Sequence, residues 1–273
     1  MYTVLVPTDF SDSAKMAAEY AAQLAAKLNG NLLLFHAYML PTPVSEMPYV
    51  LTTAEAIQQE NEAAIAQEAE RLHHTYNIQT EWLVRVGIPS SEIQVITEER
   101  TISLIVMGMK GENAIEKLIG STTTNTMKKV STPLLVVPEN SRFQPIRNIT
   151  LAVNYGSETP PPVFAPLLKL AQTFGSSLNI INITTENAAR QPESLAGKIG
   201  LDPMFRDIPR QYLEIHDTKI SGGIQQFVNS HPTDLLVMVS QTHSFFERLF
   251  GGSQTRKMAF ETHVPFLVLS QKH

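Results

Sequence analysis

The sequence contains no cysteine, which excludes disulfides, thiolate metal sites and cysteine nucleophiles. It has no apolar run near the roughly 20 residues that cross a membrane. The N-terminus enters a strand directly at Tyr2–Val6, without the basic region and apolar core of a signal peptide. These absences lead us to expect a soluble, cytoplasmic protein.

Positive charge is also scarce. The 21 Lys and Arg residues are outnumbered by 26 Asp and Glu, for a net charge of −5, and no cluster of five or more basic residues occurs. This balance argues against nucleic acid or an anionic membrane as a partner. With 43% hydrophobic residues, the 273-residue chain can bury a full core, as one large domain or as two of about 140 residues.

Motifs for catalysis are missing. The sequence has no G-x4-G-K-[ST] phosphate-binding loop and no G-x-S-x-G nucleophile elbow. No paired carboxylates stand at informative positions. The adjacent His73 and His74 cannot share a helix face, and the other histidines show no zinc-ligand spacing. We therefore predict no catalytic residues and no metal ligands.

Apolar runs of strand length alternate with helical patterns along the first half. This alternation predicts an α/β fold with a doubly wound parallel sheet. The expected strands are Val4–Val6, Leu32–Ala37, Thr80–Val86, Leu104–Met107 and Pro133–Val137. The expected helices are an alanine-rich segment ending near Leu28, then Thr53–Tyr76, Ser90–Glu99 and Thr123–Val130.

The second half repeats this order. NITLAVNYGSE at 148–158 aligns with YTVLVPTDFSD at 2–12, an offset of 146. LLVM at 235–238 matches LIVM at 104–107, an offset of 131. The falling offset indicates a shorter connection between the second and third strands of the second half.

Two tandem domains follow from this repeat, at 1–140 and 146–273, each a doubly wound parallel sheet flanked by helices. The segment Glu139–Arg147, which contains Pro145, is the expected linker. VPFLVLS at 264–270 echoes TPLLVVP at 132–138 and gives the second domain its last strand.

Three glycines, Gly108, Gly111 and Gly120, lie between the end of the Leu104 strand and a helix start. Glycine lets the backbone come close to a ligand. Amides at a helix start favour an anion. In an open α/β sheet this place lies outside the carboxyl ends of the strands, where ligands bind. The spacing predicts a phosphate-bearing small molecule, with ordinary loop glycines as the alternative.

Three features together resemble the universal stress protein family: PTDFSDSA at the start, a strand ending in HAY, and G-x-x-G then G-S before a strand ending LLVVP. The resemblance covers both halves. It implies tandem domains with five-stranded parallel sheets, similar to the adenine nucleotide alpha hydrolase-like fold. It also implies ATP binding in members that carry G-x2-G-x9-G-(S/T), and a regulatory role in the stress response.

The resemblance implies a nucleotide site in the first half, holding ATP, ADP or AMP with Mg²⁺. An aspartate follows the first strand, a residue near the end of the second strand meets the adenine, and the glycine loop holds ribose and phosphates. The matching residues are Pro7, Thr8, Asp9, Ala37, Met107, Gly108, Gly111, Gly120, Ser121 and Thr122. This chain has only eight residues between Gly111 and Gly120, one fewer than the family pattern.

The second half departs further from the family pattern. At the offsets above, Tyr155 stands in place of Asp9, Val239 in place of Gly108 and Thr242 in place of Gly111. β-Branched residues restrict positive φ and add bulk to a pocket. We expect this half to bind nucleotide weakly or not at all, although Gly252 and Ser253 keep the phosphate end.

Two questions stay open at this level. Asp9 could contact a ribose hydroxyl or Mg²⁺, or it could cap the following helix. Lys110 could meet a phosphate, or it could be a solvated loop lysine. Family members often pair through the last strand, so Pro133–Val137 and Phe266–Leu269 are expected to form an intramolecular pseudo-dimer, with a further homodimer also open.

The function predicted from these observations is adenine-nucleotide binding with a regulatory role toward a partner protein. One alternative is a nucleotide-independent, stress-protective interaction or scaffold protein. The other is a slow ATP hydrolase, because a chain that cradles ATP without a positioned base or arginine hydrolyses it slowly at most.

Overall fold

The computed structural model describes residues 2–40, 54–109, 121–139, 141–153, 159–184, 201–240 and 264–270. Over these residues the expected alternation of strands and helices is confirmed. The first half contains β1 Tyr2–Pro7, α1 Asp12–Lys27, β2 Gly30–Tyr38, α2 Ala54–Tyr76, β3 Thr80–Val86, α3 Pro89–Glu99, β4 Leu104–Met109, α4 Ser121–Lys129 and β5 Leu134–Pro138. The second half contains β6 Asn148–Val153, the 3-10 turn η1 Pro161–Phe164, α5 Ala165–Phe174, β7 Ser177–Thr184, β8 Arg210–His216, α7 Ile220–Ser230, β9 Leu235–Ser240 and β10 Phe266–Ser270.

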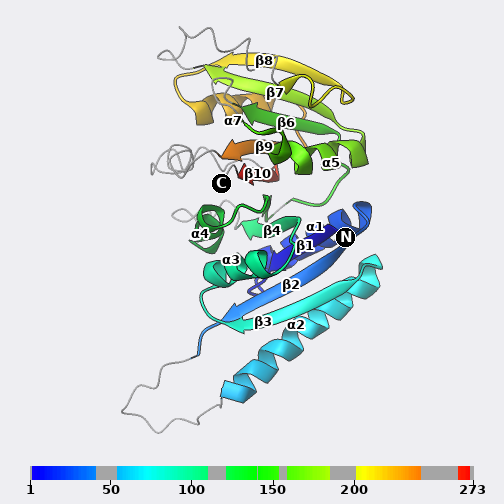
Figure 1. The fold of residues 1–273 in the computed structure, drawn as a ribbon, viewed down its shortest axis with the longest axis vertical. Coiled ribbons are helices and arrows are strands. Elements are labelled where there is room, and N and C mark those ends of the chain that lie inside the picture. Colours follow the sequence, from blue (N-terminus) through cyan, green and yellow to red (C-terminus); the bar gives the residue numbers. More distant parts are fainter. Residues whose placement is uncertain are drawn as a thin grey trace.

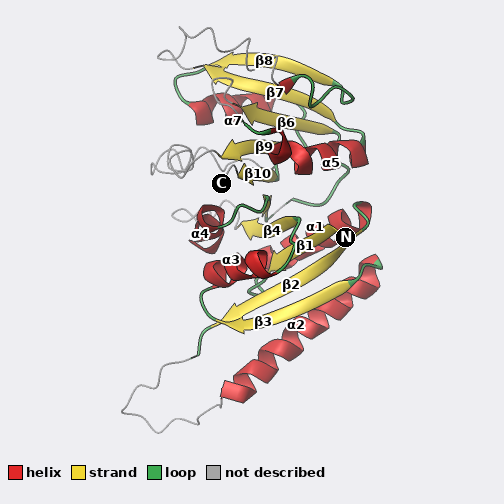
Figure 2. Cartoon of the chain, viewed as in Figure 1, coloured by secondary structure: helices red, strands yellow, loops and turns green. Residues whose placement is uncertain are grey.

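All ten of these strands lie in one sheet (Figures 1 and 2), in the order β3-β2-β1-β4-β5-β10-β9-β6-β7-β8. Strands within each half are parallel, as expected. The two halves meet where β5 and β10 run antiparallel, with Leu267 opposite Leu135. The prediction that the last strands pair within the chain is therefore confirmed. The domain boundaries at 1–140 and 146–273 remain predictions.

Helices cover both faces of the sheet, and each face buries one apolar cluster that runs through both halves. On one face α1, α2 and α5 pack against alternate strand residues such as Val4, Leu32 and Ile149. On the other face α3, α4 and α7 pack against the intervening residues, such as Leu5 and Ile105. The described helices include none that is long and apolar enough to span a membrane.

The alanine-rich helix α1 lies close to the sheet because its inward side chains are small. Six buried alanines, at positions 14, 17, 18, 21, 22 and 25, face the strands. Ser11 is the N-cap, and its hydroxyl oxygen accepts a hydrogen bond from the Ala14 N–H at 3.4 Å. This close approach brings the start of α1 to the carboxyl end of β4, where the predicted site lies.

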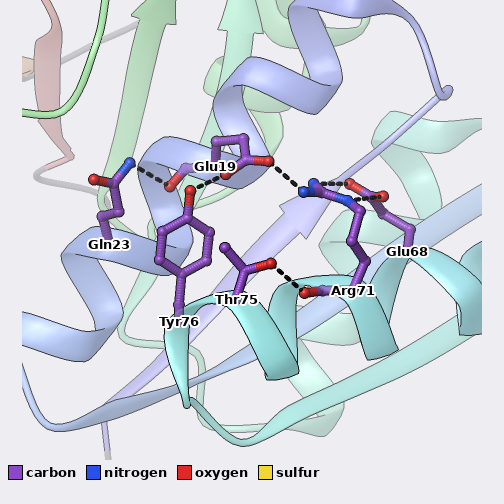
Figure 3. Close-up of polar contacts among 6 residues, drawn as sticks. All are labelled: Glu19, Gln23, Glu68, Arg71, Thr75 and Tyr76. Atoms are coloured by element: carbon purple, nitrogen blue, oxygen red, sulfur yellow. Dashed lines mark hydrogen bonds and ion pairs between the residues drawn. The ribbon is translucent and has the colours of Figure 1, made fainter.

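A polar network fastens α1 to α2 on the outer side of the molecule (Figure 3). Arg71 donates two hydrogen bonds of 2.8 Å to the carboxylate of Glu68 and lies 2.6 Å from Glu19 on α1. Tyr76 also donates its hydroxyl proton to Glu19. Burial, supported by this hydrogen bond, raises the pKa of Tyr76 to about 12. The hydrogen bonds to Glu68 are the main cause of the raised pKa of Arg71, so the guanidinium stays charged.

An aromatic chain joins the two halves through the linker. Phe143 packs edge-on against Tyr20 of α1, with ring centroids 5.2 Å apart, and lies 6.1 Å from Phe174 of α5. Burial raises the pKa of Tyr20, and the negative charge of Asp234 in the second half raises it further. Helix α1 therefore contacts the second half through its middle, while its first turn borders the predicted site.

The strand register corrects one of the offsets between the halves. Val4 pairs with Leu32 and Leu104, and Ile149 pairs with Leu178 and Leu235. The offsets of the second and fourth strands are therefore 178 − 32 = 146 and 235 − 104 = 131, as expected from the sequence. The offset of the first strand is 149 − 4 = 145, not 146.

A hydrogen bond repeated in both halves supports this corrected offset. The Thr3 N–H donates to Ser103, and the Asn148 N–H donates to Asp234. These pairs give 148 − 3 = 145 and 234 − 103 = 131. Counted at 145, the residue that corresponds to Asp9 is Asn154, so the alignment of Tyr155 with Asp9 was wrong by one position. Residues 154–158 themselves lie outside the described part of the chain.

Candidate functional site

The predicted site residues that the structure describes gather where the strand order changes direction. From β1, the chain proceeds outward to β2 and β3, and then returns to β4 on the other side of β1. Pro7, Ala37 and Met107 lie at or near the carboxyl ends of the three adjacent strands β1, β2 and β4. This is the switch point at which open α/β sheets bind ligands.

The glycine loop is largely outside the described residues. Gly111, Gly120 and Lys110 fall in the segment 110–120, and Ser121 is described only as the first residue of α4. Thr122, the second residue of that helix, is half-buried. The predicted contacts of these residues with phosphate therefore remain predictions.

Thr8 anchors the turn that leaves β1, and it uses three polar groups within the protein. Its N–H donates to the Phe35 carbonyl at 2.8 Å, which extends the β1–β2 ladder by one bond. Its hydroxyl oxygen accepts the Phe10 N–H at 3.0 Å. Its carbonyl accepts a hydrogen bond of 2.8 Å from Nδ1 of His36. Thr8 is buried, so this turn is a fixed support and not a mobile connection.

Asp9 is exposed, and one of its carboxylate oxygens organises the start of α1. Oδ1 accepts hydrogen bonds from the Ser11 N–H at 3.1 Å and the Ser11 hydroxyl at 2.5 Å. Ser11, not Asp9, is the N-cap of α1, so Asp9 does not cap the helix itself and supports the capping residue. The other oxygen, Oδ2, has no hydrogen-bond partner among the described residues. Whether Asp9 also contacts a ligand remains a prediction.

Two residues with aromatic rings near the site, Phe10 and His36, were not identified from the sequence. Phe10 has a φ of 61°, which a side chain as bulky as phenylalanine rarely adopts. This conformation places its ring 4.7 Å from the ring of His36, which in turn stacks parallel to Tyr38 at 6.4 Å. The sequence pointed to this region only through the HAY ending of β2, which was used as one of the features that resemble the family.

Gly108 is required by the packing of the protein itself. A Cβ on Gly108 would lie 2.7 Å from the carbonyl carbon of Ser13 and closer still to its oxygen. Any side chain at Gly108 would therefore collide with the first turn of α1 before it reached a ligand. The sequence suggested close approach of a ligand, whereas the structure shows close approach of a helix.

The second half carries buried Val239 at the position of Gly108, and its first helix differs accordingly. Helix α1 begins at Asp12, five residues after β1 ends at Pro7, whereas α5 begins at Ala165, twelve residues after β6 ends at Val153. The 3-10 turn η1 occupies part of this longer connection. The valine and the late helix start are consistent, because the valine side chain needs the space that the Ser13 backbone fills in the first half.

The described groups near the switch point differ in exposure. Ala37 is half-buried and Asp9 is exposed, whereas Met107 is only 5% exposed and packs in the core cluster on one face of the sheet. Within the described residues no group of three or more His, Cys, Asp or Glu could hold a metal ion. His73 bonds through Nδ1 to the Ile78 carbonyl, so it supports the end of α2.

The fold is that of an open, doubly wound α/β protein, and the described site residues predicted from the sequence gather at its switch point. A family profile described as "Universal stress protein family" matches residues 1–138. The chain belongs to the universal stress protein family.

Three relatives illustrate the extent of the similarity. A universal stress protein of Thermus aquaticus is 31% identical over 136 residues, which cover 50% of this chain and 97% of that protein. The universal stress protein Slr1230 of Synechocystis is 23% identical over 291 residues, covering 98% of this chain and 99% of its own. A crystal structure of a universal stress protein from Archaeoglobus fulgidus is 16% identical, covers 99% of this chain and 98% of its own, and has a TM-score of 0.78, which shows the same fold.

Proposed function

We propose that this chain is a cytoplasmic regulatory protein whose N-terminal half binds one adenine nucleotide, with ATP as the first candidate and ADP or AMP as alternatives. The observation that carries the proposal is the Thr8–Asp9 turn. Thr8 uses its N–H, carbonyl and hydroxyl oxygen internally, whereas exposed Asp9 presents Oδ2 at the switch point of the sheet.

The chemistry of Oδ2 limits what part of a ligand it can contact. An ionised carboxylate oxygen only accepts hydrogen bonds or binds cations. A ribose, with two neighbouring hydroxyl donors, fits this requirement, and so does a Mg²⁺ ion. A bare phosphate does not, because it would place like charges together. The ribose of a nucleotide is therefore assigned to Asp9, and its phosphates to a different part of the site.

The base is assigned to Ala37 and Met107. Ala37, on β2, has a short side chain that leaves room above the strand end, and Met107, on β4, supplies a polarisable apolar side chain. A flat purine suits this kind of surface, with its specificity set by a few polar groups. The phosphates are assigned to Gly111, Gly120, Ser121 and Thr122, where the N-terminus of α4 favours an anion.

Binding without chemistry is the expected role. Arg85, which pairs in register with Ala37, is engaged in ion pairs with Glu92 and Glu99 of α3, and the sequence has no phosphate-binding lysine motif, so we expect hydrolysis to be slow at most. The proposed effect of the nucleotide is to change the surface that a partner protein meets at the carboxyl ends of the strands.

Calorimetric titration of the nucleotide-stripped protein with Mg-ATP tests the proposal. We expect one site per chain and no binding by Gly111→Val, whose added bulk blocks the cradle. Thr242→Val is the matched control, because Thr242 corresponds to Gly111 (242 − 111 = 131) and should leave binding unchanged. Two sites per chain would contradict the degenerate second half.

Two further outcomes would replace the proposal. No heat and no thermal shift with any of the three nucleotides would favour a nucleotide-independent interaction protein. Phosphate release that persists in a highly purified sample, and vanishes in Asp9→Ala, would favour a slow hydrolase.

A further inference from the structure

We propose that His36 is a positioning residue of the nucleotide site, which holds the Thr8–Asp9 peptide in the orientation that presents Asp9 to the ribose. The proposal rests on the nucleotide-binding function proposed above. It adds a residue that does not touch the ligand and that sets the affinity through the turn.

The hydrogen bond between His36 and Thr8 connects two strands at their carboxyl ends. Nδ1 of His36 lies 2.8 Å from the Thr8 carbonyl oxygen. A carbonyl can only accept, so Nδ1 carries a proton and donates this hydrogen bond. This carbonyl belongs to the peptide that leads into Asp9, so the bond fixes the plane from which the aspartate side chain extends.

The other hydrogen bonds of the turn hold the neighbouring peptides and not the Thr8–Asp9 peptide itself. The Thr8 N–H bond to Phe35 holds the preceding peptide, and the Phe10 N–H bond to the Thr8 hydroxyl holds the following one. Among the described residues, the His36 ring is the only side chain that bonds to the Thr8 carbonyl. Loss of the ring would free the Thr8–Asp9 peptide to rotate and would also leave a partly buried carbonyl without this partner.

Phe10 provides a second contact between His36 and the turn. The Phe10 ring packs against the imidazole at a centroid distance of 4.7 Å, and its backbone is in the left-handed region. Such a conformation costs free energy for phenylalanine and persists only where the surroundings impose it. The imidazole supplies that surface, and the Tyr38 ring lies parallel to it at a centroid distance of 6.4 Å.

The second half offers a natural substitution at this register. His36 pairs with Val84, and Asn182 pairs with Glu214 (182 − 36 = 146 and 214 − 84 = 130). The Gly87 N–H donates to the Tyr38 carbonyl, and the Asp217 N–H donates to the Thr184 carbonyl. These two bonds are related by the same offsets of 146 and 130, so Asn182 is the counterpart of His36. An asparagine side chain carries an N–H donor close to the position of Nδ1, which makes His36→Asn the conservative variant.

The experiment compares Mg-ATP affinity, by calorimetry, in three variants of the full chain. His36→Leu introduces an apolar side chain of similar size and removes the donor, and we expect it to weaken binding about ten-fold, as for one lost hydrogen bond at a partly buried group. His36→Asn should restore affinity to within about three-fold of the wild type, because the donor returns. His73→Leu is the matched control: it removes an equivalent bond from Nδ1 to the Ile78 carbonyl, 2.7 Å long, and should leave affinity unchanged.

The results separate this inference from the proposed function. Absence of binding by the wild type would refute the nucleotide function itself. Wild-type binding with equal affinity in His36→Leu, or no rescue by His36→Asn, would overturn the role of His36. Nitrogen-15 shifts of the imidazole test the geometry without nucleotide: a proton on Nδ1 at neutral pH is expected, and a proton on Nε2 alone would also overturn the proposal.

Discussion

Gly108 and Ser13 are in backbone contact, 95 residues apart in the sequence: the glycine on β4 leaves room for the carbonyl of the first turn of α1. This contact ties the predicted glycine motif to the start of the helix that follows Asp9. The fold itself therefore brings Gly108 and the start of α1 together.

Replacement of Gly108 by alanine should destabilise the protein in the absence of nucleotide. The added Cβ would force α1 away from β4, and overpacking of this kind costs about 1–3 kcal/mol. Chemical denaturation of the stripped protein measures the effect. Gly175→Ala is a useful comparison, because it changes a left-handed glycine whose Cβ would meet only the end of Arg147, 3.8 Å away. A Gly108→Ala protein as stable as the wild type would mean that the contact with Ser13 is absent.

Replacing Asp9 by asparagine or by alanine should distinguish its role at the start of α1 from its proposed role in nucleotide binding. Asn keeps an oxygen for the Ser11 N–H, so stability should fall little, whereas Ala removes the acceptor and should cost about 1 kcal/mol. Both changes remove the carboxylate charge and should weaken Mg-ATP binding. Unfolding and titration of the same samples give the two readings, with Asp12→Asn as a nearby control. Wild-type affinity in both Asp9 variants would restrict Asp9 to supporting Ser11 at the start of α1.

Burial of Tyr76, supported by its hydrogen bond to Glu19, predicts a loss of stability at alkaline pH. Its pKa is raised from 10 in the unfolded chain to about 12 in the folded protein, so the folded state keeps the proton longer. The stabilisation is fully present below pH 10 and is lost as the pH rises toward 12. Denaturation at pH 9 and pH 11.5 should show this loss, and Tyr76→Phe should show a smaller one. An equal loss in both proteins would contradict the prediction.

Phe143 should contribute to the coupling of the two halves. Removal of its ring takes away the edge-on contact with Tyr20 and the contact with Phe174, at a cost of about 2–3 kcal/mol for a partly buried aromatic. Trp82→Ala is the control of similar size change, because Trp82 lies on the outer strand β3 and is 41% exposed. If thermal denaturation showed equal losses of stability for the two variants, the contacts of Phe143 would contribute no more than an exposed side chain on the edge strand.

Much of the fold could be predicted from sequence, because buried strands and alternating helices leave strong patterns. The offset of the first strand could not. Val4, Leu5 and Val6 are all fully buried, so β1 lacks the in–out alternation that would distinguish one register from the next. A slip of one residue left the apolar run intact and exchanged Asn154 for Tyr155 as the counterpart of Asp9.

The candidate site was only partly accessible from sequence, for a different reason. Pro7, Thr8 and Asp9 stand next to a strand end and could be located by that pattern. The roles of Gly108 and His36 depend on partners distant in sequence, Ser13 and Thr8, and no local pattern carries such information. The sequence offered Asp9 and Ser11 as caps of the first helix, and the structure shows that Ser11 is the cap and that Asp9 supports it through Oδ1.

The β5–β10 seam joins two partners that belong to one polypeptide. In an assembly of identical chains, every substitution appears on both sides of the symmetry axis at once. Here a substitution on one side leaves the other untouched, and the two sides are always present in equal number. A valine at the position of Gly108 and a helix that starts late can thus exist in one half while the other keeps its glycine, with no separate chain needed to complete the sheet.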